Sequence, residues 1–399
     1  MGIHRVIALL ACVWMTSALA EPRVPDRDDE VLERVLPTGN PVARELETLK
    51  QQLQRTPRDA ALAALYARRA IEQGRAGGDP RYYGYAEAAL NLWRDDPMPP
   101  LDLQVLRATL LQQRHEFAAA LAELDRVLAR DPGQAQARLT RAVVLQVQGR
   151  PRDAEADCVA LSGRASPAIV SICLASAISL SGRTQEALQI LSRTLADVAD
   201  SGILLWGQTL RAEIYMRRDE REAAERAFQD ALRTMRSNGI TDFYLLAAYG
   251  DYLLDSGRAA DLLSLFSSYP LTDALLLRQA LAAQTLAKTG GRDMAERARI
   301  YREQLRERIA DSRARGDNSH AREQAWFELY LNAAPAAALS LAADNWRNQH
   351  EPLDARLLLE AALAAGHSAA ARPVLDWMED TRIEDVHLRK LRANVLASQ

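Results

Sequence analysis

Apolar residues recur with helical spacing along most of the chain, and short polar stretches separate one apolar run from the next. Residues 101–131 contain two such runs of about fourteen residues each, and Pro132 follows them. The stretch that begins at Ala135 repeats this arrangement, 34 residues after Leu101. Because apolar residues three or four apart share one side of a helix, the pattern predicts amphipathic helices that occur in pairs.

Small residues recur at equivalent places in these helix pairs. On the first helices they are Ala67, Ala108, Ala142, Ala175, Ala212, Gly250 and Ala280. On the second helices they are Ala120, Ala154 and Ala224, with large apolar residues at Leu124, Leu191, Phe228 and Phe266. The turn glycines are Gly74, Gly149, Gly182 and Gly257, and the closing prolines are Pro57, Pro97, Pro132 and Pro270. Small residues let two helix axes approach closely, glycine accepts the left-handed conformation at a helix end, and proline ends a helix.

These residues and their 34-residue period resemble the tetratricopeptide-repeat (TPR) family. The best matches begin at Ala60, Leu101, Ala135, Ala168, Leu205 and Phe243, and the resemblance covers roughly residues 60–310. It implies an all-α fold, a right-handed superhelical solenoid of antiparallel helix pairs. One departure is residues 75–84, an insertion rich in Gly and Tyr that we expect to lengthen a loop.

The chain divides into four expected segments. Residues 1–20 are predicted to be a signal peptide, and residues 21–40, rich in acidic residues and proline, an extended tail. Residues 41–317 are predicted to form the TPR solenoid with an N-terminal capping helix. Residues 318–399 keep the habit of helix pairs but lose the 34-residue spacing, so we expect degenerate repeats and a C-terminal cap.

The N-terminus indicates export. Arg5 supplies positive charge, residues 6–14 form a short apolar core, and small residues before Glu21 suit cleavage by a signal peptidase. No second such stretch follows, so the mature chain is expected to have no transmembrane segment and to reside in the periplasm. The alternative is a lipoprotein anchored through Cys12, although cleavage there would leave a short apolar core.

Composition and motifs argue against nucleic-acid binding and catalysis. The formal net charge is −3, and no basic stripe interrupts the mixture of acidic and basic residues, so nucleic acid is not expected as a partner. The sequence has no phosphate-binding glycine loop, HExxH motif or Gly-x-Ser-x-Gly elbow. Its histidines lack the spacing of a metal site and are expected on the surface. We therefore expect no metal, no cofactor and no enzyme activity.

The resemblance also implies a concave groove lined by the first helices of successive pairs. Its predicted partner-binding residues are Leu139, Val143, Ile172, Trp206, Glu213, Met216, Arg217, Tyr244, Asp251 and Asp255. Trp206 and Tyr244 occupy matching positions, where aromatic side chains are either anchors for a partner or part of the core. The Lys and Asn that clamp chaperone carboxylates in other TPR domains are absent, since Leu139 and Val143 stand there in one repeat.

Cys158 and Cys173 are the only cysteines that remain after signal cleavage. They fall on helices that pack against each other in a TPR stack, and an exported protein enters an oxidising compartment. A disulfide between them is therefore expected. The alternative is a pair of buried free thiols that act as small apolar side chains.

Taken together, these features favour a periplasmic adaptor or scaffold that binds a segment of a partner protein in its groove, within an envelope assembly or export complex. This assignment to the envelope rests on analogy of fold. The alternative is an accessory or regulatory subunit of an envelope enzyme. Least favoured is an enzyme with its own site in the irregular C-terminal third, since no nucleophile, base and ligand set converges there.

Overall fold

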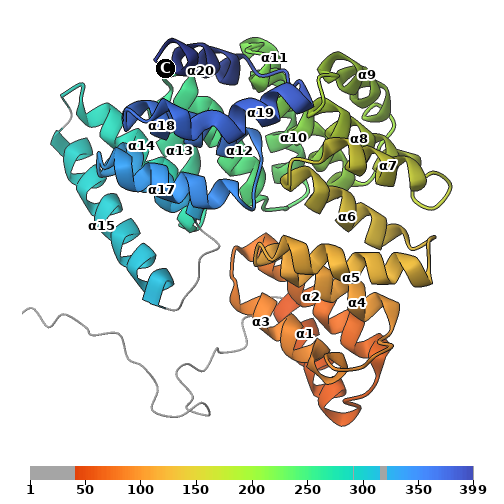
Figure 1. The fold of residues 1–399 in the computed structure, drawn as a ribbon. Coiled ribbons are helices and arrows are strands. Elements are labelled where there is room, and N and C mark those ends of the chain that lie inside the picture. The colour runs from red at the N-terminus through yellow and green to blue at the C-terminus, as the bar shows by residue number, and fades with distance from the viewer. Residues whose placement is uncertain (1–40, 291, 315–320, 399) are drawn as a thin grey trace, which may run out of the picture. The chain divides into compact units, whose positions relative to one another are not determined.

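Helix follows helix along the chain in the computed structural model, which describes residues 41–290, 292–314 and 321–398 (Figure 1). Strands are absent from this described part of the chain, so the all-α prediction is confirmed. The predicted signal peptide, the extended tail and Cys12 lie outside the described residues, as do residues 315–320.

The helices alternate with short turns. In the first half they are α1 (Pro41–Arg55), α2 (Ala60–Gly77), α3 (Arg81–Leu90), α4 (Leu101–Gln113), α5 (Phe117–Arg130), α6 (Ala135–Val147), α7 (Pro151–Ala160), α8 (Pro167–Ser179), α9 (Thr184–Thr194) and α10 (Ser201–Arg217). In the second half they are α11 (Arg221–Ser237), α12 (Phe243–Asp255), α13 (Ala259–Phe266), α14 (Asp273–Ala287), α15 (Arg292–Ala314), α16 (Ala321–Trp326), α17 (Pro335–Trp346), α18 (Pro352–Ala364), α19 (Arg372–Thr381) and α20 (Val386–Ala397). Short 3-10 turns lie at Asn91–Trp93 and Ser368–Ala371, and a π-helical turn lies at Phe327–Leu331.

Consecutive helices pack in pairs, from α4 with α5 to α14 with α15. The small residues predicted on the first helices lie at these contacts, and Ala108, Ala142 and Ala212 are fully buried. Gly250 of α12 has no room for a side chain, because a Cβ there would stand 2.7 Å from Cζ of Phe266. The helix pairs therefore pack through close approach at small residues, as the sequence predicts.

The expected long loop at residues 75–84 is instead mostly helical. Helix α2 continues to Gly77, and α3 starts again at Arg81 after a short turn. Gly74, expected in the turn, is buried within α2, where a Cβ would lie 2.8 Å from Cε1 of Tyr83. The glycine serves close packing of α2 on α3, and the helix ends at Gly78 in the left-handed conformation.

The C-terminal helices share an apolar core with α14. Trp326, Phe327, Trp346 and Leu358 are buried in one cluster that also contains Leu276 of α14. These helices lack the 34-residue spacing but bury their apolar sides in the same way as the regular pairs. This shared core attaches helices α16–α20 to α14.

Candidate functional site

Two of the predicted groove helices, α10 and α12, each begin with an aspartate N-cap. Asp200 accepts a hydrogen bond from the backbone N–H of Ile203 at 2.8 Å, and Asp242 accepts one from Leu245 at 3.0 Å. Such caps satisfy backbone donors at a helix start and fix where the helix begins. We call the surface formed by the ten predicted groove residues the inner face.

Tyr244 is the exposed aromatic residue of the inner face. Its side chain is 61% exposed, and its hydroxyl donates a hydrogen bond of 2.6 Å to Oε1 of Glu213 on α10. Burial raises the pKa of Glu213 to about 7, although the Tyr244 hydroxyl and the charge of Arg217 oppose this. The Tyr244 pKa is raised well above its ordinary value, chiefly by the negative charge of Glu213. The pair therefore holds a tyrosyl ring at the surface by a hydrogen bond.

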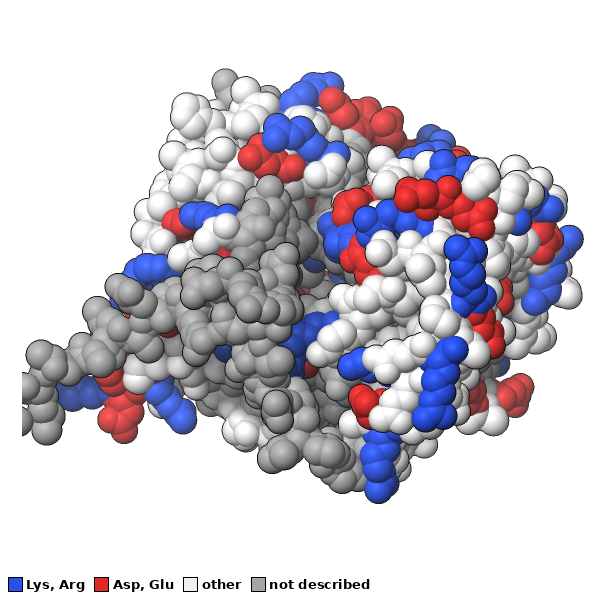
Figure 2. All heavy atoms as spheres, turned by 90° about the horizontal axis from the view of Figure 1, so that it is seen from below, with Lys and Arg blue, Asp and Glu red and all other residues white. Residues whose placement is uncertain are grey.

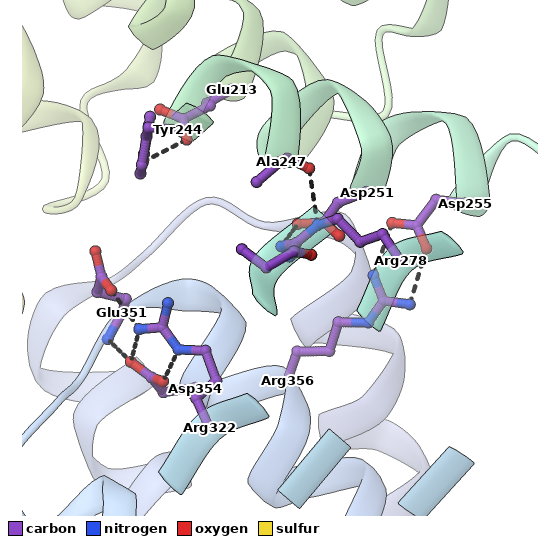
Figure 3. A network of polar contacts seen from close by, with 11 residues as sticks. Glu213, Tyr244, Ala247, Asp251, Asp255, Arg278, Arg322, Glu351, Asp354 and Arg356 are labelled. Carbon is purple, nitrogen blue, oxygen red and sulfur yellow. Dashed lines mark hydrogen bonds and ion pairs between the residues drawn. The ribbon is translucent and has the colours of Figure 1, made fainter. Parts of the chain in front are cut away.

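Charged residues of the C-terminal helices face this pair (Figure 3). Nε of Arg322 donates to Oδ1 of Asp354 at 2.6 Å, and Arg322 also pairs with Glu351. The charges of Glu351 and Arg322 both act on the ionisation of Tyr244. Tyr244 is exposed to solvent, and it faces α16 and α18 of the same chain.

Farther along α12, two ion pairs fix the remaining inner-face carboxylates. Asp251 binds Nη2 of Arg278 at 2.6 Å, and both side chains are buried. Arg356 of α18 binds both carboxylate oxygens of Asp255, at 2.7 and 2.9 Å (Figure 3). Paired, planar contacts of this kind are among the stronger ion pairs. Helix α18 is therefore joined directly to the end of α12.

The ten predicted groove residues differ in how far they are exposed. Three are buried and present no side-chain surface to a partner: Ile172 at 0% exposure, Arg217 at 8% and Asp251 at 5%. Trp206 is partly buried and packs against the core clusters on both sides of α8, which favours a packing role over that of a free anchor. Partly buried are Leu139, Val143, Met216, Glu213 and Asp255. The expected continuous surface is thus reduced, because neighbouring repeats cover several of its members.

The sequence pattern does not identify four charged residues of the C-terminal helices that lie around the inner face: Arg322, Glu351, Asp354 and Arg356. They lie after residue 318, where the repeat spacing is lost and no groove position can be assigned. The one local signal is a capping box at the start of α18, in which Asp354 and Glu351 bond each other's backbone. That signal marks a helix start and says nothing of what the helix approaches.

A disulfide joins Cys158 of α7 to Cys173 of α8, with a Cα–Cα separation of 5.5 Å. Both residues are buried, at 0% and 1% exposure. The separation lies within the ordinary range of about 4.4–6.8 Å for such bonds. The bond links the second helix of one pair to the first helix of the next.

Other parts of the described chain offer little chemistry. A pocket of about 350 Å³ between α5, α6 and α7 is lined by Arg138, Arg141 and Arg150, but each of these pairs with an aspartate. Within the described residues, no three His, Cys, Asp or Glu side chains gather as metal ligands, and no helix is long and apolar enough to cross a membrane. On the face drawn in Figure 2, acidic and basic residues are interspersed.

Comparison with solved structures finds other helical-repeat proteins. A tetratricopeptide repeat protein from Parabacteroides merdae is 17% identical, with 59% of this chain and 98% of that chain covered and a TM-score of 0.37. The Cut9–Hcn1 hetero-tetramer of the APC/C is 14% identical over 89% of this chain and 67% of that chain, with a TM-score of 0.47. A human IFIT1 dimer with m7Gppp-AAAA is 12% identical over 85% and 86%, with a TM-score of 0.39.

Such likenesses carry no information on activity or partner. No protein-family model matches the sequence, and no curated protein matches it. Any function must therefore be argued from this chain's own residues.

Proposed function

We propose that this helical-repeat protein of the tetratricopeptide type binds a segment of another protein on its inner face, with Tyr244 as the principal contact. The observation that carries the proposal is the 61% exposure of Tyr244, while Trp206 at the matching position is partly buried and packs against two core clusters. An exposed tyrosine offers a large contact area at a small entropic cost. Aromatic side chains of this kind dominate the energetics of many interfaces.

Polar groups beside the ring give the site its selectivity. Glu213 and, across from it, Glu351 and Arg322 place charges of both signs around Tyr244. Charged groups at an interface steer partners and exclude wrong ones more than they add affinity. We infer that the partner is a protein segment with a defined charge pattern, and that the chain acts as an adaptor or scaffold and not as an enzyme.

We also propose that the protein is exported to the periplasm. The N-terminal pattern of a charged residue, an apolar core and small residues before Glu21 supports export to the periplasm. We propose that the partner belongs to an envelope assembly or export complex. The buried disulfide of Cys158 and Cys173 is compatible with such an oxidising compartment.

Substitution of the exposed ring tests this function. We expect Tyr244→Ala to lose the partner that the wild-type protein captures from envelope extracts, because truncating an interface anchor costs about 2 kcal/mol or more. Its melting temperature should stay close to wild type, since the ring is exposed. Trp206→Ala should instead lower the melting temperature, because this side chain packs against two core clusters.

Tyr85→Ala is the matched control, since that ring on α3 is 46% exposed and lies outside the inner face. It should leave both capture and melting unchanged. If Tyr244→Ala folds normally and still retains every captured protein, binding lies elsewhere and the proposal fails.

A further inference from the structure

The C-terminal helices meet the middle repeats along a line of polar contacts. On the repeat side these contacts fall at or near the turn between the two helices of each pair. We call this line the seam and define it by the pairs Gln349–His115, His350–Val147, Arg152–Asp380, Thr184–Glu384, Lys390–Asp219 and Arg356–Asp255. It joins residues 101 to 234 positions apart in the sequence.

One residue connects the seam to the functional site. Oε1 of Gln349 accepts a hydrogen bond of 2.9 Å from Arg322, and its Nε2 lies 2.7 Å from Nδ1 of His115. Because Arg322 can only donate, the orientation of the Gln349 amide is fixed, and its NH₂ group points to His115. The charged group that faces Tyr244 is thus held to the turn between α4 and α5.

The C-terminal residues approach two turn glycines so closely that neither position has room for a side chain. A Cβ on Gly149 would lie 2.7 Å from Nε1 of Trp377 and 2.8 Å from Cβ of His350. A Cβ on Gly182 would lie 2.8 Å from the backbone oxygen of Arg382. Both glycines also have positive φ, at +70° and +75°. They therefore serve two purposes, the left-handed turn and the close approach of α17–α20.

The seam also contains buried polar groups without a hydrogen-bond partner among the described residues. They are Nδ1 of His350 and Nε1 of Trp377, with Nε of Arg217 close to the C-terminal Asp385. Each such group lacks a stabilising hydrogen bond in the closed seam, and water would satisfy it if the seam opened. The closed seam is therefore less stable than its number of contacts suggests.

The other side of the same helices is apolar and well packed. Trp346, Leu359 and Val374 are buried in the cluster shared with α14, and the partly buried Leu180, which follows α8, packs against it. Apolar burial is the larger stabilising term in such packing. The C-terminal helices are consequently held firmly at α14 and more weakly along the seam.

We propose that α17–α20 form a displaceable cover beside the inner face, and that opening of the seam makes room for a partner segment next to the exposed Tyr244 ring. This inference rests on the proposed function, because it concerns the same site. In the closed arrangement Glu351, at the start of α18, faces Tyr244, and Arg356 of α18 binds Asp255. In the open arrangement these groups separate from the inner face, and a partner segment takes their place.

Glycine substitutions in the full chain test the cover. Gly149→Ala and Gly182→Ala insert a methyl group where the C-terminal helices sit. Gly257→Ala is the matched control, because Gly257 has φ +72° at the equivalent turn but no atom within 4 Å of a Cβ. All three carry the same backbone strain, so differences among them report on the seam alone.

Hydrogen–deuterium exchange read by mass spectrometry is the first measurement. We expect amides of α19 and α20 to exchange about tenfold faster or more in Gly149→Ala and Gly182→Ala, and at the wild-type rate in Gly257→Ala. Equal exchange in all three variants overturns the proposal. Asp255→Asn removes the bidentate contact of Arg356 without touching a turn, and it should speed exchange in α18; Asp230→Asn, which breaks the Arg211 pair within α10 and α11, should not.

Capture of the partner is the second measurement. Variants with an open seam should capture at least about threefold more partner from envelope extracts than Gly257→Ala. If exchange rises but capture that depends on Tyr244 does not, the cover has no regulatory role and the proposal is overturned. If Tyr244→Ala has no effect on capture while exchange rises as expected, the proposed function fails and the mobility of the cover stands.

Discussion

Tyr244 and Trp206 occupy the same place in successive helix pairs, but their environments differ. The neighbour of Trp206 is α8, whose apolar side supplies Leu174 and the buried Cys173 to the cluster around it. The neighbour of Tyr244 is α10, which supplies the carboxylate of Glu213. An apolar neighbour favours packing of the Trp206 ring against the core, while the carboxylate of Glu213 holds the Tyr244 ring at the surface through its hydroxyl. The difference arises from the preceding helix and not from the aromatic residue itself.

Glu213 leads to a prediction about pH. Its pKa is raised from 4.5 to about 7, so the folded state holds the proton more tightly than the unfolded state. Its contribution to stability is therefore best below about pH 4.5, falls as the pH rises through 7, and reaches its lowest value above that pH. Glu213→Gln stays neutral and should be more stable than wild type at pH 8.5 by about 1–3 kcal/mol, at about 1.4 kcal/mol per pKa unit.

Urea unfolding at pH 4.5 and pH 8.5 measures this difference. The two proteins should match at pH 4.5, where Glu213 is protonated in the folded state. Glu222→Gln, on a side chain of α11 that is 93% exposed, should change neither curve. A Glu213→Gln variant without added stability at pH 8.5 would show that the carboxylate ionises freely in the folded protein.

The effect of a glycine within a helix depends on whether its position lies at a contact with another helix. Gly84 in α3 is exposed and has no atom within 4 Å of a Cβ. Gly250 in α12 has Cζ of Phe266 at 2.7 Å and Cδ of Arg278 at 3.2 Å from a Cβ. The same residue type therefore costs helix stability at one position and permits helix contact at the other.

Alanine substitution should separate these two roles. Gly84→Ala should stabilise the protein by up to about 1 kcal/mol, the difference in helix propensity between the two residues. Gly250→Ala gains the same propensity but overpacks α12 against α13 and α14, at a cost of about 1–3 kcal/mol, so the net change should be destabilising. Thermal unfolding followed by circular dichroism measures both. Equal stabilisation by the two substitutions would contradict the close contact at Gly250.

On the scale of the whole molecule, the regular helix pairs and the irregular C-terminal helices act together. Gln349 contacts His115 across 234 residues, and Arg356 binds Asp255 across 101 residues. Gln349 also binds Arg322, which faces Tyr244, while Arg356 joins α18 to the other end of α12. Part of the candidate site is therefore supplied by helices that follow the recognisable repeats.

The proposed export of the protein can be tested by its location and its N-terminus. Expressed in a Gram-negative host, the protein should appear in the periplasmic fraction with Glu21 as its first residue, because small residues precede that position. Cys12→Ser should leave this product unchanged. Intact-mass analysis and N-terminal sequencing read both results. An acylated Cys12 in the membrane fraction would support the lipoprotein alternative, and an unprocessed cytoplasmic chain would contradict export altogether.

The helix pairs and the positions where their helices touch can be predicted from the amino-acid sequence alone. Ala142, Ala212 and Gly250 were identified from the 34-residue period, and all three lie at buried helix contacts. This success has a local cause, since the two helices of a pair are close in sequence and their apolar spacing reports directly on the side that they bury.

Which inner-face residues remain exposed depends on the folded arrangement of the helices. Ile172 carries no sign in the sequence that the next helix covers it, and Asp255 none that Arg356 binds it. Gly149 was predicted as a turn residue, but its closeness to Trp377 joins positions more than 200 residues apart. Such contacts depend on how the whole stack brings its ends together, and no short-range pattern of apolar and polar residues encodes that path.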